Sequence, residues 1–465
     1  MVSAKLYSKN DWQRLLASPR DPSEGYRSEA RRDYARVIHC PSFRRLQGKT
    51  QLFPSPESDF FRNRITHSLE VAQIAKSIAA KLNANEPALK KQLSCEIAEV
   101  AGLIHDLGHP PFGHNGEKAL DKCMIGYGGF EGNAQTIRIL TRLEKKEMGA
   151  RLEDTDKGSE NRVGLNLCFR TIAASIKYDR EIPLQRDTAK LIKGYYGSEA
   201  PLVEKIKKAI APSLKKGDKF KTIECQIMDI ADDIAYSTYD LEDSFKAGFI
   251  SPITILAGGS ELFEEVAKTI NKRTPDLSMK AAEVASILKR SFARLIPDDS
   301  IKVNNQDEGL YYSSLLYAGS ESLIKSGYVR TTFTSELIKT FMGGIRFEYN
   351  SHCPALSKVW LEESVRKEVE VFKNITFVSM IMSPRLKIVE HRGLQIVTDI
   401  FSCLSGKGGA ALLPTDYRQT YKHFTKKADK MRVICDFVAG MTDRYAVEFY
   451  SRLNSTNPES IFKPY

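Results

Sequence analysis

The stretch SCEIAEVAGLIHDL, residues 94–107, is apolar on nearly every side of a helix and ends in a His-Asp-Leu sequence. A helix that is apolar all round lies buried in a core. Burying an imidazole and a carboxylate, here His105 and Asp106, is unfavourable unless both are paired or bind a metal ion. Gly108 and the Pro-Pro pair that follows then end the helix. The chain must therefore fold around this helix and supply partners for both polar side chains.

Helical periodicity extends well beyond this stretch. Residues 64–82 and 221–246 carry apolar side chains at helical spacing, and the sequence shows neither a fixed-period repeat nor a regular alternation of strands and helices. The exceptions are apolar runs at 376–382 and 386–397, which predict short strands. The sequence therefore predicts an all-α fold, mainly helical, with a few short strands in the C-terminal half.

The length of 465 residues allows a large core, divided among two or three packed units. Two polar stretches, residues 144–164 and 212–221, predict surface loops. No sharp linker is visible. We therefore predict an N-terminal segment, a helical core and a mostly helical C-terminal region, with the bounds 1–60, 61–246 and 247–465.

The composition excludes several classes of protein. The hydrophobic fraction of 42% and the charged fraction of 27% are ordinary for globular chains, which argues against disorder and fibrous repeats. No apolar run approaches the roughly 18 residues of a membrane span, and the N-terminus lacks the apolar core of a secretion signal. The eight cysteines are scattered without a CxxC pair, as reduced core thiols would be. We therefore expect a cytoplasmic protein with no membrane partner.

The net charge of +11, from 69 basic and 58 acidic residues, fits an anionic partner such as a nucleotide, a phosphate or a nucleic acid. A solvated basic surface fits it equally well. Arg44, Arg45 and Lys49 pose the same choice between phosphate contact and solvent, and for these three the solvated surface is favoured.

Four of the eight histidines lie between residues 67 and 114. Alone, the pair His105-Asp106 would more often be a capped helix end than a pair of ligands. Together with His67 and with the aspartates of the apolar segment 224–243, it forms a set of two imidazoles and two carboxylates. Such a mixed nitrogen and oxygen set suits Mn, Fe, Co, Ni or Zn, and Mg less well. A divalent ion held there could lower the pKa of bound water and bind a phosphate oxygen.

Six sequence blocks point to a family. They are RRLQGKTQLFP (44–54), RITHSLEV (64–71), HDLGHPPFGHNGE (105–117), GGFEGNAQT (128–136), IADDIAYSTYDLED (230–243) and GMTDRYA (440–446). The sequence resembles the HD-domain metal phosphohydrolases, and more closely the deoxyguanosine triphosphate triphosphohydrolases, whose blocks occur in this order over nearly the whole chain. The resemblance implies a helical HD-domain fold and a nucleotide site to which the N-terminal segment contributes.

The resemblance also implies a role for each matching position. The metal ligands would be His67, His105, Asp106 and Asp232, with Asp233 as the rival for the last. The catalytic residues would be His114 and Glu117 beside the metal, with His109 near the phosphates. The substrate would be bound by Arg64 at the triphosphate, by Gln51, Tyr236 and Asp240 at the deoxyribose 3′-hydroxyl, and by Leu52. The cofactor would be one divalent ion per site, Mn²⁺ or Mg²⁺ ahead of Co²⁺, Ni²⁺, Fe²⁺ or Zn²⁺.

The reaction and the partners follow from the same resemblance. A dNTP, dGTP first, would be hydrolysed between the sugar oxygen and the α-phosphorus to a deoxynucleoside and intact tripolyphosphate. His114 would act as the base for the nucleophile or as the acid for the leaving group. Single-stranded DNA or a nucleotide would be an effector, and the chain would form a homo-oligomer, a tetramer or a hexamer. Two alternatives stay open: an HD-domain nucleotidase or phosphodiesterase, and a nucleic-acid-binding regulatory protein that has kept the HD fold.

Overall fold

The computed structural model describes residues 5–18, 25–51, 62–147, 156–186, 190–215, 217–295, 308–381 and 384–454. Contacts between Cα atoms divide the chain into two units. The first comprises Met1–Asp229, Phe347–Lys358 and Ile388–Tyr465, and the second comprises Ile230–Arg346 and Val359–Lys387. The three-part division predicted from the sequence stays a prediction.

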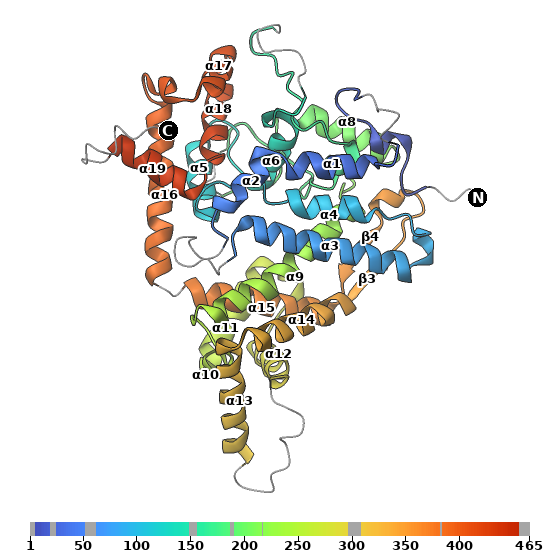
Figure 1. Cartoon of the computed structure of the whole chain (residues 1–465), viewed down its shortest axis with the longest axis vertical. Coiled ribbons are helices and arrows are strands. Elements are labelled where there is room, and N and C mark those ends of the chain that lie inside the picture. Colours follow the sequence, from blue (N-terminus) through green and yellow to red (C-terminus); the bar gives the residue numbers. More distant parts are fainter. Residues whose placement is uncertain are drawn as a thin grey trace. The chain divides into compact units, whose positions relative to one another are not determined.

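The first unit is built almost entirely of helices (Figure 1). Two short strands, β1 (Glu181–Ile182) and β2 (Tyr195–Tyr196), pair in parallel within it. Its helices are α1 (Glu29–Ile38), α2 (Pro41–Arg45), α3 (Arg64–Asn85), α4 (Cys95–Ile104), α5 (Gly113–Cys123), α6 (Gly132–Arg138), α7 (Phe169–Ala173), α8 (Ala200–Ile210), α17 (Thr415–His423), α18 (Lys427–Ala439) and α19 (Asp443–Asn454).

Helices α3 and α4 of this unit lie side by side (Figure 1). Helix α3 begins at a capping box, in which the Asn63 side chain accepts from Thr66 N and Thr66 Oγ1 accepts from Asn63 N. Helix α4 begins at Ser94, whose side chain accepts from Ile97 N, and its apolar residues are buried as predicted. A Cβ at Gly102 would lie 2.5 Å from Cα of Ala72, so only glycine lets the two helices approach this closely.

The second unit has an aromatic core of its own. The ring centroid of Phe292 lies 6.1–6.4 Å from those of Phe245, Phe333 and Phe372. The four phenylalanines come from four different helices. The helices of this unit are α10 (Pro252–Ala257), α11 (Gly259–Arg273), α12 (Ala281–Ala293), α13 (Glu308–Lys325), α14 (Gly327–Gly343) and α15 (Glu363–Ile381). The chain crosses between the units within α9 (Ile223–Lys246), α16 (Pro384–Ser405) and the paired strands β3 (Ile345–Glu348) and β4 (Lys358–Leu361).

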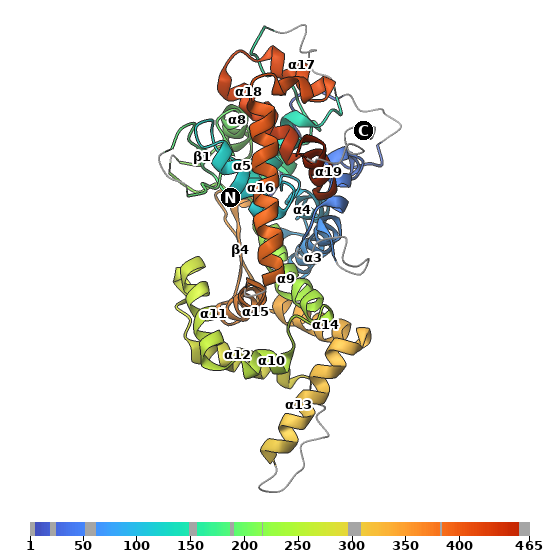
Figure 2. The ribbon, with the colours of Figure 1, turned by 90° about the vertical axis from the view of Figure 1, so that its left-hand side faces the viewer.

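The strands predicted at 376–382 and 386–397 are wrong. The described residues of both ranges lie in α15 and α16, and Figure 2 shows α16 as one long helix. The apolar and β-branched residues of α15 recur at helical spacing, with Val369, Phe372 and Thr376 all buried. Burial of one helical face outweighs the weaker preference of such residues for strands. The fold class itself, all-α with a few short strands in the C-terminal half, is confirmed by β3 and β4.

Two further expectations can be compared with the structure. Among the described residues, no helix is both long and apolar enough to cross a bilayer. All eight cysteines are described and free of disulfides; five are buried, but Cys403 is exposed and so is not a core thiol.

Candidate metal centre

Three predicted ligands meet where α3 passes the end of α4. His67 lies on the first turn of α3, and His105 and Asp106 directly follow Ile104, the last residue of α4. One ligand atom from each of the three side chains lies within 4.8 Å of the others, and all three residues are buried. The close helix contact at Gly102 brings them together, because it places the last turn of α4 against α3.

The His105 ring is held in an orientation that suits a metal ligand. Its Nδ1 lies 2.7 Å from the carbonyl oxygen of Gly102. When Nδ1–H donates to that carbonyl, the lone pair is on Nε2, which lies 3.4 Å from Asp106 Oδ1. Histidines that bind metals commonly donate their other ring N–H to a carbonyl or a carboxylate. The donor set of two imidazoles and one carboxylate therefore fits a divalent ion.

Asp106 is buried yet remains a carboxylate. Burial raises the pKa of its side chain, but the neighbouring His109, His105 and Arg64 outweigh burial and hold the pKa well below its usual range. Arg64 Nη1 donates to Asp106 Oδ2 at 2.5 Å. Metal ligands must be deprotonated, so this environment prepares Asp106 to bind a cation.

The fourth predicted ligand, Asp232, lies on the part of α9 that belongs to the second unit. Its rival Asp233 forms a 2.6 Å ion pair with Lys373 of the same unit, which engages that carboxylate. Tyr236 and Asp240 follow Asp232 at four and eight residues and therefore share its face of the helix. Asp232 stays the predicted ligand, and the other two stay predicted sugar contacts.

A second pair of polar side chains lies on the first turn of α5. Nδ1 of His114 is 3.1 Å from Glu117 Oε2, and Gly132 N donates to Glu117 Oε1 at 2.8 Å. Burial raises the pKa of Glu117, but the His114 hydrogen bond, the neighbouring His109 and the Gly132 N–H together lower it to about 2. Glu117 is therefore an ionised, fixed acceptor for His114, whose own side chain is 72% exposed.

His109 connects this pair with the metal ligands. Its Nδ1 lies 3.0 Å from Asp106 Oδ1, and its ring centroid is 5.5 Å from that of His114. Burial and the positive charge of Arg64 lower the pKa of His109, so it is neutral at neutral pH. The structure thus brings all three predicted catalytic residues beside the three clustered ligands.

The loop between α4 and α5 has an unusual backbone. Phe112, at the start of α5, adopts the left-handed conformation with φ of 61°. A Cβ at Gly116 would lie 1.9 Å from the carbonyl oxygen of Pro111, so the turn requires glycine there. This geometry folds the loop back on α5 and places His114 near His109.

Two predicted substrate residues of the first unit are described, and Leu52 lies outside the described residues. Arg64 begins α3 and is buried. Its Nε, and Oε1 of Gln51, are buried atoms with no hydrogen-bond partner among the described residues. An unsatisfied buried polar atom costs about 1–3 kcal/mol. Both atoms therefore fit contacts with a polar ligand.

Comparison with known proteins decides the family. The HD domain matches residues 64–237, and the phosphohydrolase-associated domain matches residues 359–452. The chain is 47% identical to deoxyguanosinetriphosphate triphosphohydrolase-like protein 2 of Mesorhizobium japonicum, over 99% of this chain and 100% of the relative. The chain belongs to the deoxyguanosinetriphosphate triphosphohydrolase-like family of HD-domain proteins.

Relatives so named from Aliivibrio fischeri (31% identical; 92% of this chain, 93% of the relative) and Shewanella pealeana (29% identical; 97% of each chain) also match. This membership and the His67–His105–Asp106 cluster support a metal-dependent phosphohydrolase.

Sequence analysis missed one residue of this HD-domain site. Lys49 is not on a solvated surface: it is buried, and its Nζ donates to the carbonyl oxygens of His109, at 2.5 Å, and Ala439, at 2.9 Å. Burial, with Arg45 and Arg64 nearby, lowers the pKa of Lys49 to about 7 against the opposing charge of Asp443. The signal available in the sequence was the joint occurrence of RRLQGKTQLFP and GMTDRYA, the blocks that contain Lys49 and Asp443.

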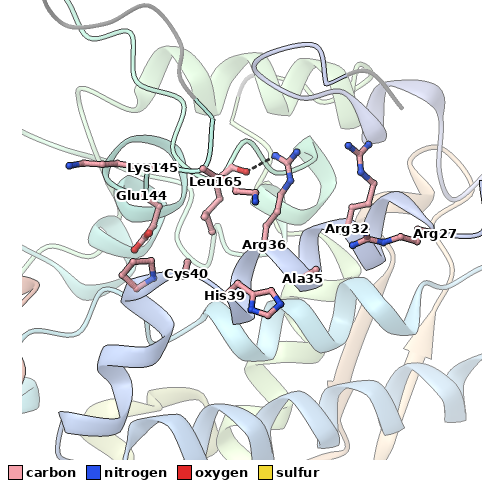
Figure 3. A pocket seen from close by; sticks show the side chains of 11 residues that line it. Arg27, Arg32, Ala35, Arg36, His39, Cys40, Glu144, Lys145 and Leu165 are labelled. Atoms are coloured by element: carbon pink, nitrogen blue, oxygen red, sulfur yellow. Dashed lines mark hydrogen bonds between the residues drawn. The ribbon is translucent and has the colours of Figure 1, made fainter. Parts of the chain in front are cut away.

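A basic pocket of about 410 Å³ lies elsewhere in the first unit (Figure 3). Three of its cations already have partners: Arg32 pairs with Glu29, Arg36 donates to Leu165 O and pairs with Glu147, and Lys145 pairs with Asp416. None of the clustered metal ligands of the HD domain lines it. The polar residues that line it are Arg27, Arg32, Arg36, His39, Glu144, Lys145 and Lys146. We therefore assign no ligand to this pocket.

Proposed function

We propose that the protein is a metal-dependent dNTP triphosphohydrolase that converts dGTP and water to deoxyguanosine and tripolyphosphate. The observation that carries this proposal is the His67–His105–Asp106 cluster with His109 and the His114–Glu117 pair beside it. The similarity to relatives named deoxyguanosinetriphosphate triphosphohydrolase-like supports the choice of substrate.

His67, His105, Asp106 and Asp232 would hold one divalent ion, Mn²⁺ or Mg²⁺ in the first place. When bound, such an ion neutralises charge on phosphate oxygens and lowers the pKa of water. The buried, ionised state of Asp106 and the fixed ring of His105 are what the chain itself contributes to that binding.

Arg64 and His109 would contact the phosphates. Phosphoryl transfer spreads negative charge over the oxygens of the transferred group, and fixed cations and donors stabilise that charge. Arg64 is anchored through Nη1 on Asp106, while its Nε has no hydrogen-bond partner among the described residues. Nδ1 of His109 faces the ionised Asp106 Oδ1 at 3.0 Å, so His109 would donate from Nε2 to a phosphate oxygen in its protonated form, which the negative charge of a bound triphosphate favours.

His114 would move the proton. The ionised Glu117 accepts from His114 Nδ1–H, which leaves Nε2 as the proton-transferring atom. The bond between the sugar oxygen and the α-phosphorus breaks, the water oxygen goes to phosphorus, and a proton goes to the sugar oxygen. His114 can serve the attacking water or the departing sugar oxygen from this position.

Deoxyribose would be bound by Gln51, Tyr236 and Asp240, with Leu52 beside them. Oε1 of Gln51 is a buried acceptor with no hydrogen-bond partner among the described residues. Tyr236 and Asp240 lie on one face of α9 and offer a hydroxyl and a carboxylate to a 3′-hydroxyl.

The wider setting is carried over from the sequence composition, the pattern along the chain and the family resemblance. It includes a cytoplasmic location, a homotetramer or homohexamer, and single-stranded DNA or a nucleotide as effector. It also includes the division into an N-terminal segment, an HD core and a C-terminal region at residues 60 and 246. Light scattering that finds only monomers would contradict the oligomer.

Product analysis tests the proposed function. The purified protein is incubated with each of the four dNTPs and GTP in Mn²⁺, Mg²⁺ or Co²⁺, and the products are separated by ion exchange. We expect deoxyguanosine and tripolyphosphate from dGTP, and no products from the His105→Ala, Asp106→Ala double variant. Release of dGMP or orthophosphate, or hydrolysis of monophosphates alone, would favour a nucleotidase or phosphodiesterase instead.

A further inference from the structure

Lys49 joins two distant parts of the first unit. Its ammonium group donates to the carbonyl oxygen of His109, in the loop between α4 and α5, and to that of Ala439, the last residue of α18. Lys49 and Ala439 are 390 positions apart in the sequence. Its own carbonyl oxygen accepts from Arg64 N at 3.2 Å, so Lys49 also contacts the start of α3.

Asp443, the first residue of α19, makes a second connection to the same loop. Its Oδ1 accepts from Phe112 N at 2.9 Å. Its Oδ2 accepts from Thr50 N at 2.8 Å and from Thr50 Oγ1 at 2.5 Å. One carboxylate thus binds the left-handed Phe112, two residues before His114, and Thr50, the residue before Gln51.

We propose that Lys49 and Asp443 are positioning residues for the phosphohydrolase site, which fasten the α18–α19 turn to the His109–His114 loop and to the segment before Gln51. The proposal rests on the function proposed above. It gives the C-terminal phosphohydrolase-associated domain, which contains Ala439 and Asp443, a defined part in the reaction carried out by the HD domain.

The loop needs such support because its own backbone offers little. Its two prolines have no N–H to donate, and the left-handed conformation of Phe112 is unfavourable for a residue with a side chain. Lys49 Nζ satisfies the His109 carbonyl, and the Asp443 carboxylate satisfies the Phe112 N–H. A hydrogen bond to a charged group such as this carboxylate is the stronger kind. A displacement of about 1 Å in a catalytic group can reduce a rate by about 10²-fold.

Three variants separate the two connections. Lys49→Met keeps the length and apolar stem of the side chain but removes the hydrogen bonds to the carbonyl oxygens of His109 and Ala439. Asp443→Asn keeps the shape of the side chain but replaces one acceptor oxygen with an NH₂ group, which cannot accept from Phe112 N or Thr50. Thr50→Val removes a single hydroxyl. Thr50→Ser restores that hydroxyl, and Lys208→Met removes an exposed lysine of α8 as a matched control.

Two measurements are made on each folded variant. The first is kcat and KM for the best dNTP, with Mn²⁺ binding followed by electron paramagnetic resonance. The second is hydrogen–deuterium exchange of the peptides that cover 107–120 and 96–104, which needs no activity. The exchange measurement therefore still tests the connections if the wild-type protein hydrolyses no dNTP, a result that would overturn the proposed function.

We expect Lys49→Met and Asp443→Asn to lower kcat by about 10²-fold with little change in KM or in Mn²⁺ binding. Exchange should rise in 107–120 and stay unchanged in 96–104. Thr50→Val should show a smaller decrease in kcat that Thr50→Ser reverses. Two results would overturn the proposal. One is a wild-type kcat both in Thr50→Val and in any folded variant among Lys49→Met and Asp443→Asn. The other is unchanged hydrogen–deuterium exchange in residues 107–120 of these variants.

Discussion

The two buried carboxylates of the site, Asp106 and Glu117, carry charge because cations and donors face each of them. Burial alone would raise the pKa of both side chains. His109, His105 and Arg64 reverse this for Asp106, and His114, His109 and Gly132 N reverse it for Glu117. The neighbouring side chains and N–H groups therefore keep both buried carboxyl groups ionised.

The lowered pKa of Glu117 predicts a pH-dependent contribution to stability. Because the folded pKa of about 2 lies below the unfolded value of about 4.3, the contribution is complete above pH 5 and is lost as the pH falls through 4.3 toward 2. It amounts to about 3 kcal/mol at neutral pH. Urea unfolding of the wild type and Glu117→Gln should therefore differ most at pH 5–7 and progressively less at pH 4 and 3. A difference that stays constant over this range, or one shared by the exposed control Glu264→Gln, would contradict this prediction.

Replacement of His114 should separate catalysis from metal binding. His114 is mostly exposed and lies outside the ligand cluster, so His114→Ala should fold and still bind metal. We expect turnover to fall by roughly 10²–10⁴-fold, the usual contribution of a proton-transferring residue. Steady-state kinetics and metal analysis measure the two effects, with the exposed His352→Ala as control. Full activity or loss of metal in His114→Ala would contradict this role.

At the scale of elements, the crossing of α3 and α4 builds the metal centre. The apolar pattern of residues 94–107 predicted the second of these helices, and the pattern from residue 64 predicted the first. Their close approach could not be predicted, because nothing in the sequence shows that Gly102 faces Ala72. The strands predicted within α15 and α16 failed for a related reason: the partner surface decides whether a short apolar run is helical or extended.

Gly102→Ala tests this crossing. The new methyl group would lie 2.5–2.6 Å from the backbone of Ala72, which cannot move aside as a flexible side chain can. We expect the free energy of unfolding to fall by about 1–3 kcal/mol. Metal binding should also weaken, because His67 belongs to α3 and His105 follows α4, so separating the two helices separates the two ligands. Gly126→Ala adds a methyl group where no atom lies within 4 Å and serves as the control. Stability and metal affinity equal to the wild type in Gly102→Ala would show that the helices tolerate separation.

At the scale of the whole molecule, the sequence revealed the candidate site where its residues lie close together along the chain. The histidines and acids between residues 67 and 117 are such a group, and their chemistry limits the possible functions. Contacts between Lys49, Thr50 and the α18–α19 turn span some 390 positions and could be found only in three dimensions. Lys49 was misjudged because a lysine in a basic stretch is usually solvated.

In the proposed reaction, one divalent metal site hydrolyses a dNTP to a nucleoside and an intact triphosphate. The most direct measurement is ³¹P NMR of dGTP incubated with the protein, first treated with a chelator and then given Mn²⁺ or Mg²⁺. We expect no reaction before metal is added and the resonances of tripolyphosphate alone afterwards. Orthophosphate, pyrophosphate or dGMP as the first product, or hydrolysis that persists without metal, would contradict it.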